Sequence, residues 1–504
     1  MVARCGGRDL RQGKAEDMET RAAHFTHRSC YVNFGEHLQN AWNPNMLFPE
    51  ALNRWSRDDW ASFLRMLKAF GFTCFEYWLV PTLFDRPALA ASRVQTDFAA
   101  TMRDINDMAH SIGLKTKVLL AANTIGPNWY FACPNDHEDK QLILALWGHW
   151  MRELAGTDII GIFPGDVGGC NRNGCDHETF VDLCLELTEI AERENTAARV
   201  EIGTWGTPFA GWGTDMREIP GWDGSWAMVT DERFRTPETP AYIWNGKPSR
   251  ARAAMEYLVK RLPQFPDDCM VAINLGFSPD GDATMGGDAR PYAREVAKLR
   301  AITSWDYSLS EGELINYPHW RLPRMAARRR EERSAAPYVG GMSYTMTPNL
   351  NLLTMYAAGR FFLDPAADPD AVSRDFCSQV FGEEHGALGE LFEAFEVVPG
   401  WGHYPRRHWS KQALVEKYSQ MIEHLESADM SGCSLPLFPD PEQYREDLLW
   451  FARIFLEMAG ANPDRERIRQ DYWKKALAIY DSISMSADPR AKTAANQFSN
   501  ILAG

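Results

Sequence analysis

The sequence predicts an α/β fold, namely a (β/α)8 TIM barrel with a C-terminal α-helical domain, on three observations. Short apolar runs alternate with helical patterns up to about residue 312, as in parallel βαβ units. Most predicted strands start roughly 40 residues apart, more than the ~30 that a minimal barrel unit needs. Beyond about residue 312 the sequence shows only helical patterns. A doubly wound open sheet is the alternative, but it requires a Gly-rich phosphate loop, which Gly35-Glu36-His37 is not.

The first elements can be read directly from the residues. Strand one, 30–34, is an apolar run that ends at Gly35. Ser56 and Asp59 form a capping pair before an amphipathic helix, and Gly71 ends that helix. The same alternation continues along the chain. The eight predicted strands are 30–34, 72–79, 117–121, 158–163, 199–205, 225–230, 270–275 and 302–307.

The domain prediction follows from this pattern. The chain has 504 residues, too many for one ordinary domain, and its 45% hydrophobic content is that of a folded protein. Further helices are predicted at 352–361, 414–425, 444–458 and 468–483. We expect a loosely ordered N-terminal extension over 1–27, the barrel over 28–312, and a helical C-terminal domain over 313–504 that packs on the barrel.

Composition restricts the partners. A formal net charge of −15 argues against nucleic acid and anionic membranes. The polar N-terminal segment has no apolar core of a signal peptide, and no run of 18 apolar residues exists. The ten cysteines are scattered and form no disulfide framework. The sequence therefore predicts a cytoplasmic protein, and it leaves open whether the chain forms a homo-oligomer.

The fourth predicted strand leads to the strongest candidate for chemistry. Its apolar residues suit a strand that is buried on both faces, and Pro164-Gly165 ends it. Asp166 follows, with Gly168 and Gly169 after it. Barrels keep their catalytic groups at the carboxyl ends of the strands, so Asp166 is predicted to be catalytic. The alternative is that Asp166 only caps the turn.

Four more acids are predicted to be catalytic from their positions at or near strand ends. They are Asp231, Glu232, Asp306 and Glu76. For Glu76 two interpretations stay open: it reaches the site, or it fills the barrel interior beside a partner.

A second group is predicted to bind substrate. With 18 Trp in the chain, several fall near strand ends, where an indole can stack on the apolar face of a sugar ring. The predicted substrate-binding residues are Glu36, Asn123, Trp205, Trp226, Asp280, Trp305 and Tyr307.

No cofactor and no metal ligand is predicted. A nucleophile elbow, a P-loop and a His-Glu-x-x-His zinc motif are all missing from the sequence. Cys170 and Cys175 with Asp176-His177 allow a zinc interpretation, but structural zinc normally needs four ligands. The loop 286–288 allows a phosphate interpretation but lacks a nearby Lys. Carboxylates and tryptophans at a barrel mouth without a cofactor signature indicate glycoside hydrolysis with a carbohydrate substrate.

The motif Phe163-Pro164-Gly165-Asp166-Val167 resembles the strand-four signature of hexosaminidase-type glycoside hydrolases. The segment 165–175, the order of barrel and helices, and the helix 352–360 before Phe361-Phe362-Leu363-Asp364-Pro365 look like the wider α-glucuronidase and hexosaminidase-like superfamily. The long loops and the extra domain favour a pocket over an open groove, which indicates an exo-acting enzyme that cleaves a terminal sugar. Val167 stands where the family has its acidic Glu. Either another strand supplies the acid, or Asp166 is itself the acid.

Two other function classes stay open from the sequence. One is a carbohydrate-binding barrel without catalysis, and the other is a metal-dependent lyase or isomerase that acts on a sugar acid or phosphate. Activity on aryl glycosides separates a hydrolase from both.

Overall fold

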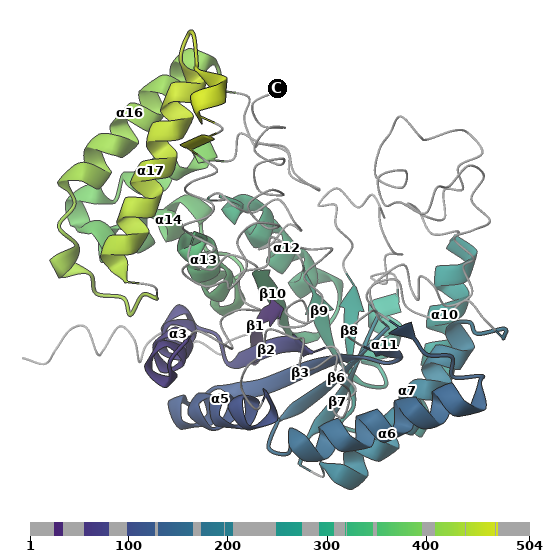
Figure 1. The fold of residues 1–504 in the computed structure, drawn as a ribbon. Coiled ribbons are helices and arrows are strands. Elements are labelled where there is room, and N and C mark those ends of the chain that lie inside the picture. The colour runs from purple at the N-terminus through teal and green to yellow at the C-terminus, as the bar shows by residue number, and fades with distance from the viewer. Residues whose placement is uncertain are drawn as a thin grey trace, which may run out of the picture.

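The computed structural model describes residues 25–33, 55–79, 98–125, 130–164, 173–195, 197–204, 248–274, 292–306, 318, 320–345, 350–395, 409–438, 440–468 and 470–471. Within these ranges eight parallel strands pair into a closed barrel (Figure 1). In chain order they are β1 (His27–Asn33), β2 (Cys74–Leu79), β3 (Lys115–Ala121), β6 (Ile159–Phe163), β7 (Arg199–Gly203), β8 (Met270–Asn274), β9 (Ala301–Trp305) and β10 (Tyr338–Thr345).

The closed parallel barrel confirms the predicted fold class. Around the barrel the strands follow the order β1-β10-β9-β8-β7-β6-β3-β2. Each barrel strand therefore pairs with the barrel strands before and after it along the chain, and β10 pairs with β1. A two-stranded hairpin, β4 (Thr124–Ile125) and β5 (Tyr130–Phe131), follows β3. The predicted strand 225–230 and residues 1–24 of the predicted N-terminal extension lie outside the described residues.

The strand that completes the barrel, β10, lies beyond residue 312, the predicted end of the barrel, so that predicted boundary is wrong. β10 pairs with β1 on one side and with β9 on the other. Gly340 and Gly341 interrupt its apolar pattern, which hides the strand in the sequence. Both are needed, because a Cβ on Gly340 would lie 1.6 Å from the carbonyl oxygen of His27. A Cβ on Gly341 would lie 2.0 Å from the Ser304 hydroxyl.

Helices alternate with the strands and cover the barrel. The capping pair predicted at the first of them is present, because Ser56 and Asp59 each accept a hydrogen bond from the other's backbone amide. Gly71 ends that helix with φ 101°, a left-handed conformation that glycine adopts without strain. The covering helices are α3 (Arg57–Phe70), α5 (Phe98–Ile112), α6 (His137–Glu153), α7 (His177–Glu194), α10 (Pro248–Arg261), α11 (Ala293–Ala297), α12 (Leu322–Ala335) and α13 (Leu352–Leu363).

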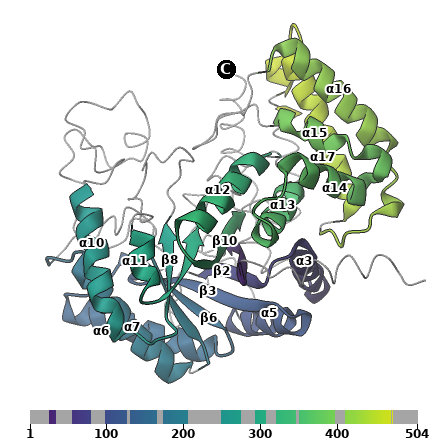
Figure 2. The same cartoon turned by 180° about the vertical axis from the view of Figure 1, so that it is seen from behind.

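The last of these helices closes the outer ring. α13 follows β10 and packs beside both α12 and α3, next to β10 in the rear view (Figure 2). Its contact with α3 is tight, since a Cβ on Gly359 would lie 1.9 Å from the Phe70 carbonyl oxygen. α13 is therefore the eighth barrel helix rather than the start of the C-terminal domain.

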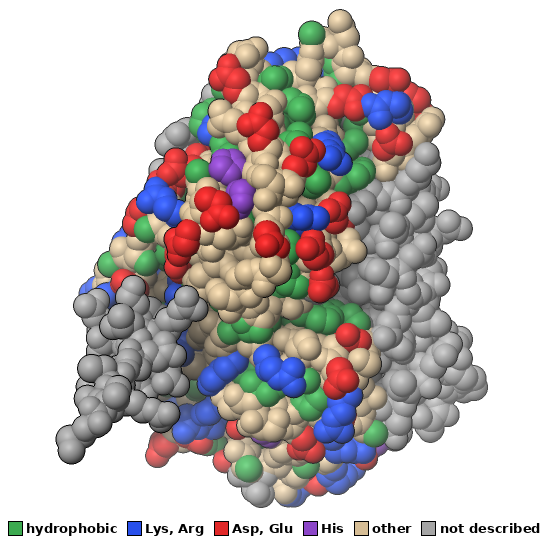
Figure 3. All heavy atoms as spheres, turned by 90° about the vertical axis from the view of Figure 1, so that its left-hand side faces the viewer, with side chains coloured by type: hydrophobic (Ala, Val, Ile, Leu, Met, Phe, Trp, Pro, Cys, Tyr) green, Lys and Arg blue, Asp and Glu red, His purple; other side chains and the backbone are tan. Residues whose placement is uncertain are grey.

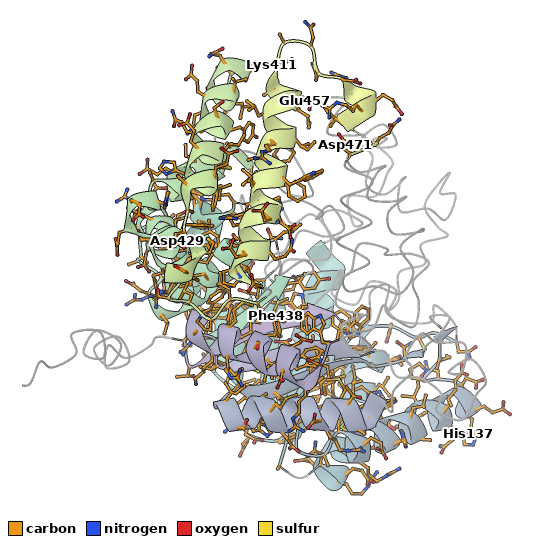
Figure 4. The ribbon with its side chains drawn as sticks, turned by 60° about the vertical axis from the view of Figure 1, so that its left-hand side comes forward. His137, Lys411, Asp429, Phe438, Glu457 and Asp471 are labelled. Carbon is orange, nitrogen blue, oxygen red and sulfur yellow. The ribbon has the colours of Figure 1, made fainter. Side chains whose placement is uncertain are left out.

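The C-terminal domain is helical over its described residues. It contains α14 (Pro369–Phe381), α15 (Leu388–Leu391), α16 (Lys411–Ser427) and α17 (Pro441–Ala459). Phe438, just before α17, lies beside α3, where its ring centroid is 4.6 Å from that of Trp55 (Figure 4). The domain therefore packs on the barrel through α3 as well as through α13.

The outer face of this domain carries mixed charge. Figure 3 shows acidic and basic side chains interspersed over it. Ion pairs such as Arg453 with Glu426, 2.7 Å apart, join α17 to α16. No helix in the described ranges has the length and apolarity that a membrane crossing requires.

Gly340→Ala should lower the free energy of unfolding by at least roughly 3 kcal/mol or prevent folding, because its Cβ would overlap the His27 backbone. Gly432→Ala is the control, since a Cβ there meets nothing within 4 Å. Urea unfolding of both variants measures the effect. A wild-type midpoint for Gly340→Ala would contradict this account of barrel closure.

Candidate functional site

Aromatic rings fill the barrel interior near the carboxyl ends of the strands. Phe163, the last residue of β6, stacks on Trp305, the last of β9, with centroids 5.3 Å apart. Trp78 lies 5.9 Å from Phe163, and Tyr31 lies 5.7 Å from Trp305 and 4.8 Å from Tyr344. These five rings, here the aromatic layer, belong to a cluster separate from the larger core under the helices. A ligand at this end of the barrel must therefore lie above them.

A buried ion cluster lies beneath the aromatic layer. Glu76, Lys117 and Glu201 each lie two residues before an inward-facing position on β2, β3 and β7. The Lys117 Nζ is 2.9 Å from a Glu76 oxygen and 2.6 Å from a Glu201 oxygen, and all three side chains are at most 2% exposed. Gly161 on the neighbouring strand β6 leaves room for Leu119, because a Cβ there would lie 2.2 Å from the Leu119 Cδ2.

Burial and the neighbouring charges together set the pKa values of Lys117 and Glu76. Burial alone lowers the pKa of Lys117, but Glu201 and Glu76 together raise it above its ordinary value, so the ammonium stays charged. Burial raises the pKa of Glu76, and Glu201 raises it further, against the pull of Lys117. One cation between two carboxylates favours a proton on Glu76, which leaves the cluster neutral. Glu76 thus faces inward beside a partner, and its catalytic role stays a prediction.

A second buried network lies between β9 and the helix layer. Asp306, which directly follows β9, accepts a 2.5 Å hydrogen bond from Arg329 of α12. Arg329 also donates to Glu332 at 2.6 and 2.7 Å and to the Ser304 hydroxyl at 3.1 Å. Its guanidinium stacks 4.0 Å from the ring centroid of Phe362. Asp306 therefore points away from the barrel axis, opposite to Trp305, and its catalytic role too stays a prediction.

Glu332 is the titratable member of this network. Burial raises the pKa of Glu332 to about 7, Asp306 raises it as well, and Arg329 lowers it. A single Arg329 between two buried carboxylates explains the direction, because a proton on Glu332 neutralises the set.

Asn123 lies just past β3 at the same end of the barrel. Its Nδ2 donates to the Ala132 carbonyl at 2.8 Å, which ties β3 to the loop before α6. Its Oδ1 is buried and has no hydrogen-bond partner among the described residues. An unsatisfied buried acceptor costs free energy, and a ligand hydroxyl could satisfy it. Asn123 is 1% exposed, so its contact with a substrate stays a prediction.

The remaining predicted residues cannot be placed in this way. Trp305 is part of the aromatic layer and 1% exposed, so contact with a substrate stays a prediction for it. The following predicted site residues lie outside the described residues: Asp166, Asp231, Glu232, Glu36, Trp205, Trp226, Asp280 and Tyr307.

Sequence reasoning missed the central cation of each of these two networks, Lys117 and Arg329. Lys117 could have been noticed as a charged residue inside an apolar strand, and so could its partner Glu201. Both occupy inward-facing positions in the two-residue alternation of their strands. Arg329 gave no such signal, since it stands in a run of arginines and glutamates that is typical of a solvated helix. Within the described ranges, no three His, Cys, Asp or Glu side chains are grouped to hold a metal ion.

No protein-family model and no curated protein matches this chain. Several solved structures are similar to it. An O-GlcNAc hydrolase of Thermobaculum terrenum, solved as a mutant, is 13% identical, with a TM-score of 0.49 and 94% of each chain covered. CpGH84B is 9% identical, with a TM-score of 0.48, over 95% of this chain and 74% of its own. A GH138 enzyme targeting pectin rhamnogalacturonan II is 9% identical, with a TM-score of 0.47, over 95% and 84%.

Lys117→Met should lower the free energy of unfolding by about 3–5 kcal/mol, because it leaves Glu76 and Glu201 buried without their cation. Lys140→Met is the matched control. It removes a half-exposed pair with Glu186 and should cost less than about 1 kcal/mol. Equal small losses in urea unfolding would show that the buried cluster adds no stability.

The pH dependence of stability tests Glu332. Its folded pKa of about 7 exceeds the ordinary 4.5, so its contribution to stability is complete below about pH 4.5 and is lost as the pH rises through about 7. Glu332→Gln cannot titrate. Between about pH 5 and about pH 8 the wild type should therefore lose up to about 3 kcal/mol more than this variant. Glu331→Gln is the control, because Glu331 is adjacent in sequence and half-exposed, and its stability should depend on pH as that of the wild type does. The same pH dependence of stability in all three proteins would contradict the assignment to Glu332.

Proposed function

We propose that this protein is a glycoside hydrolase that cleaves a terminal sugar at the carboxyl face of its barrel. The observation that carries the proposal is the position of β6. It is the fourth barrel strand in chain order and ends at Phe163, where the hexosaminidase-like motif begins. Asp166 follows two residues after Pro164 in the sequence. A motif read from sequence alone thus coincides with the strand end at which barrel enzymes keep their chemistry.

Two further features support a carbohydrate as the substrate. The aromatic layer gives the site a rigid apolar floor, and sugar rings present C–H faces that pack on such surfaces. The buried Oδ1 of Asn123, which has no hydrogen-bond partner among the described residues, offers an acceptor for a sugar hydroxyl. Together they combine an apolar platform with a directional polar group, which is the usual composition of a small-molecule site.

The proposed reaction is acid–base cleavage by carboxyl groups. Asp166, protonated, gives its proton to the glycosidic oxygen as the C–O bond breaks, and positive charge develops at the sugar carbon and ring oxygen. Asp231 or Glu232, or an acetamide of the substrate, would act from the other face of the ring, and water completes the hydrolysis. Asp306 and Glu76, each held by a buried cation, would fix the strands beneath the site.

Asp166→Asn tests the role of the acid, because it keeps the shape of the side chain and removes the proton. A panel of aryl glycosides first identifies a substrate for the wild type. On a substrate with a poor leaving group the variant should lose roughly 10²- to 10⁴-fold in kcat/KM, and with an activated aryl leaving group much less. Equal losses on both substrates would instead assign Asp166 an orienting role.

Asp158→Asn is the matched control, since Asp158 immediately precedes β6 at its opposite end, where it accepts hydrogen bonds from Thr116. Its kcat/KM should stay within a few-fold of the wild type. A folded Asp166→Asn protein with wild-type rates would refute the assignment of the acid. A wild type that binds oligosaccharides but hydrolyses no glycoside would be a carbohydrate-binding barrel instead.

A further inference from the structure

Two cysteines meet beside the carboxyl face of the barrel. Cys133 lies between β5 and α6, and Cys175 lies just before the N-cap of α7. Their sulfur atoms are 3.4 Å apart, and both side chains are buried. The two thiols come from loops 42 residues apart in the sequence, so their contact is a product of the fold.

A turn holds Cys175 against Cys133. Asn173 and Gly174 both have positive φ, 52° and 70°, a conformation for which these residue types are suited. The Asn173 side chain donates to the Cys133 sulfur at 3.5 Å, and Asn135 donates to the Asn173 carbonyl at 3.0 Å. The chain is thus fixed on both sides of the sulfur contact.

The helices behind the two loops fix them further. The Cys133 amide donates to Asp139 in the first turn of α6 at 2.8 Å. Asp176, the residue after Cys175, is the N-cap of α7 and accepts from the Thr179 amide. α6 and α7 pack side by side on the barrel, and Figure 4 shows His137 at the amino end of α6. Both sulfurs are therefore carried by anchored segments.

The two sulfurs are in non-bonded contact. A disulfide has its sulfurs about 2.05 Å apart, so the pair must approach by roughly 1.4 Å. Side-chain rotation can supply such a shift without refolding of either loop. Asn173 and Gly174, the two residues before Cys175, are exposed, so the turn that carries Cys175 lies at the surface of the described part of the chain.

We propose that Cys133 and Cys175 form a reversible disulfide when the protein is exposed to hydrogen peroxide. In the first step hydrogen peroxide oxidises the Cys175 thiol to a sulfenic acid and is reduced to water. In the second the Cys133 thiol attacks that sulfur, the S–S bond forms, and the hydroxyl leaves as a second water. Two thiols and one peroxide thus give one disulfide and two waters. A dithiol reductant reverses the change by thiol–disulfide exchange.

The bond would join two loops at the candidate site. Ala132, next to Cys133, accepts the Asn123 hydrogen bond, so the first loop is tied to the end of β3. Cys175 ends the connection from β6 to α7, the one that contains Asp166 in the sequence. Oxidation therefore links the connections that follow two neighbouring barrel strands. The disulfide itself does not depend on the proposed function.

Peroxide treatment of the folded full-length protein tests this proposal. After alkylation of the remaining thiols, mass spectrometry of the unreduced digest should show a peptide pair that joins Cys133 to Cys175. Peroxide treatment should remove two titratable thiols, and dithiothreitol should restore both. Cys175→Ser and Cys133→Ala should each abolish the cross-linked peptide. Cys433→Ser should keep it, although Cys433 is more exposed than either partner.

Two results would overturn the proposal. One is peroxide modification of Cys433 or other thiols while Cys133 and Cys175 both stay alkylatable. The other is a bound zinc ion that is released by Cys133→Ala and that prevents oxidation until a chelator is added, which would make the pair part of a metal site. Near-UV circular dichroism of each variant, recorded first, confirms that the proteins compared are folded.

Discussion

Closure of the sheet depends on how closely β10 approaches its two neighbours. Gly340 lies against the His27 backbone of β1, and Gly341 lies against Ser304 of β9, at distances that no side chain permits. Without this fit the first and last strands would leave two unpaired edges. Every interior feature then depends on closure, since the aromatic layer and the ion cluster each draw residues from strands on different sides of the barrel.

The interior combines two kinds of packing in adjacent levels. The aromatic layer resists compression through dense apolar contact, whereas the cluster around Lys117 ties β2, β3 and β7 together by directional ion pairs. On the outside, Arg329 does the same for β9, β10 and α12. β9 and β10 are thus held from both faces, by Trp305 and Tyr344 of the aromatic layer on the inside and by Arg329 on the outside, which is what a site with fixed geometry requires.

The sequence allowed the prediction of the fold class because most strands are apolar runs that residue patterns can reveal. β6 is the clearest case, with every position buried. β10 was not predicted because Gly340 and Gly341, which barrel closure requires, interrupt its apolar run. Asp306 was correctly expected near a strand end, but its direction was not predictable, since that depends on whether Trp305 or its neighbour faces inward. Partners such as Arg329 are set by tertiary contacts that local patterns do not encode.

The pairing of β1 with β10 also has a consequence for how the chain is made. On the ribosome β1 emerges early, and its partner β10 follows some 300 residues later. During that interval one edge of the nascent sheet keeps its amide and carbonyl groups unpaired, a situation that invites association with other chains. The barrel gains its long-range contacts late in synthesis, and such non-local pairing makes folding slow. The same closure that protects the finished protein therefore leaves the half-made one with an unpaired sheet edge until β10 is synthesised.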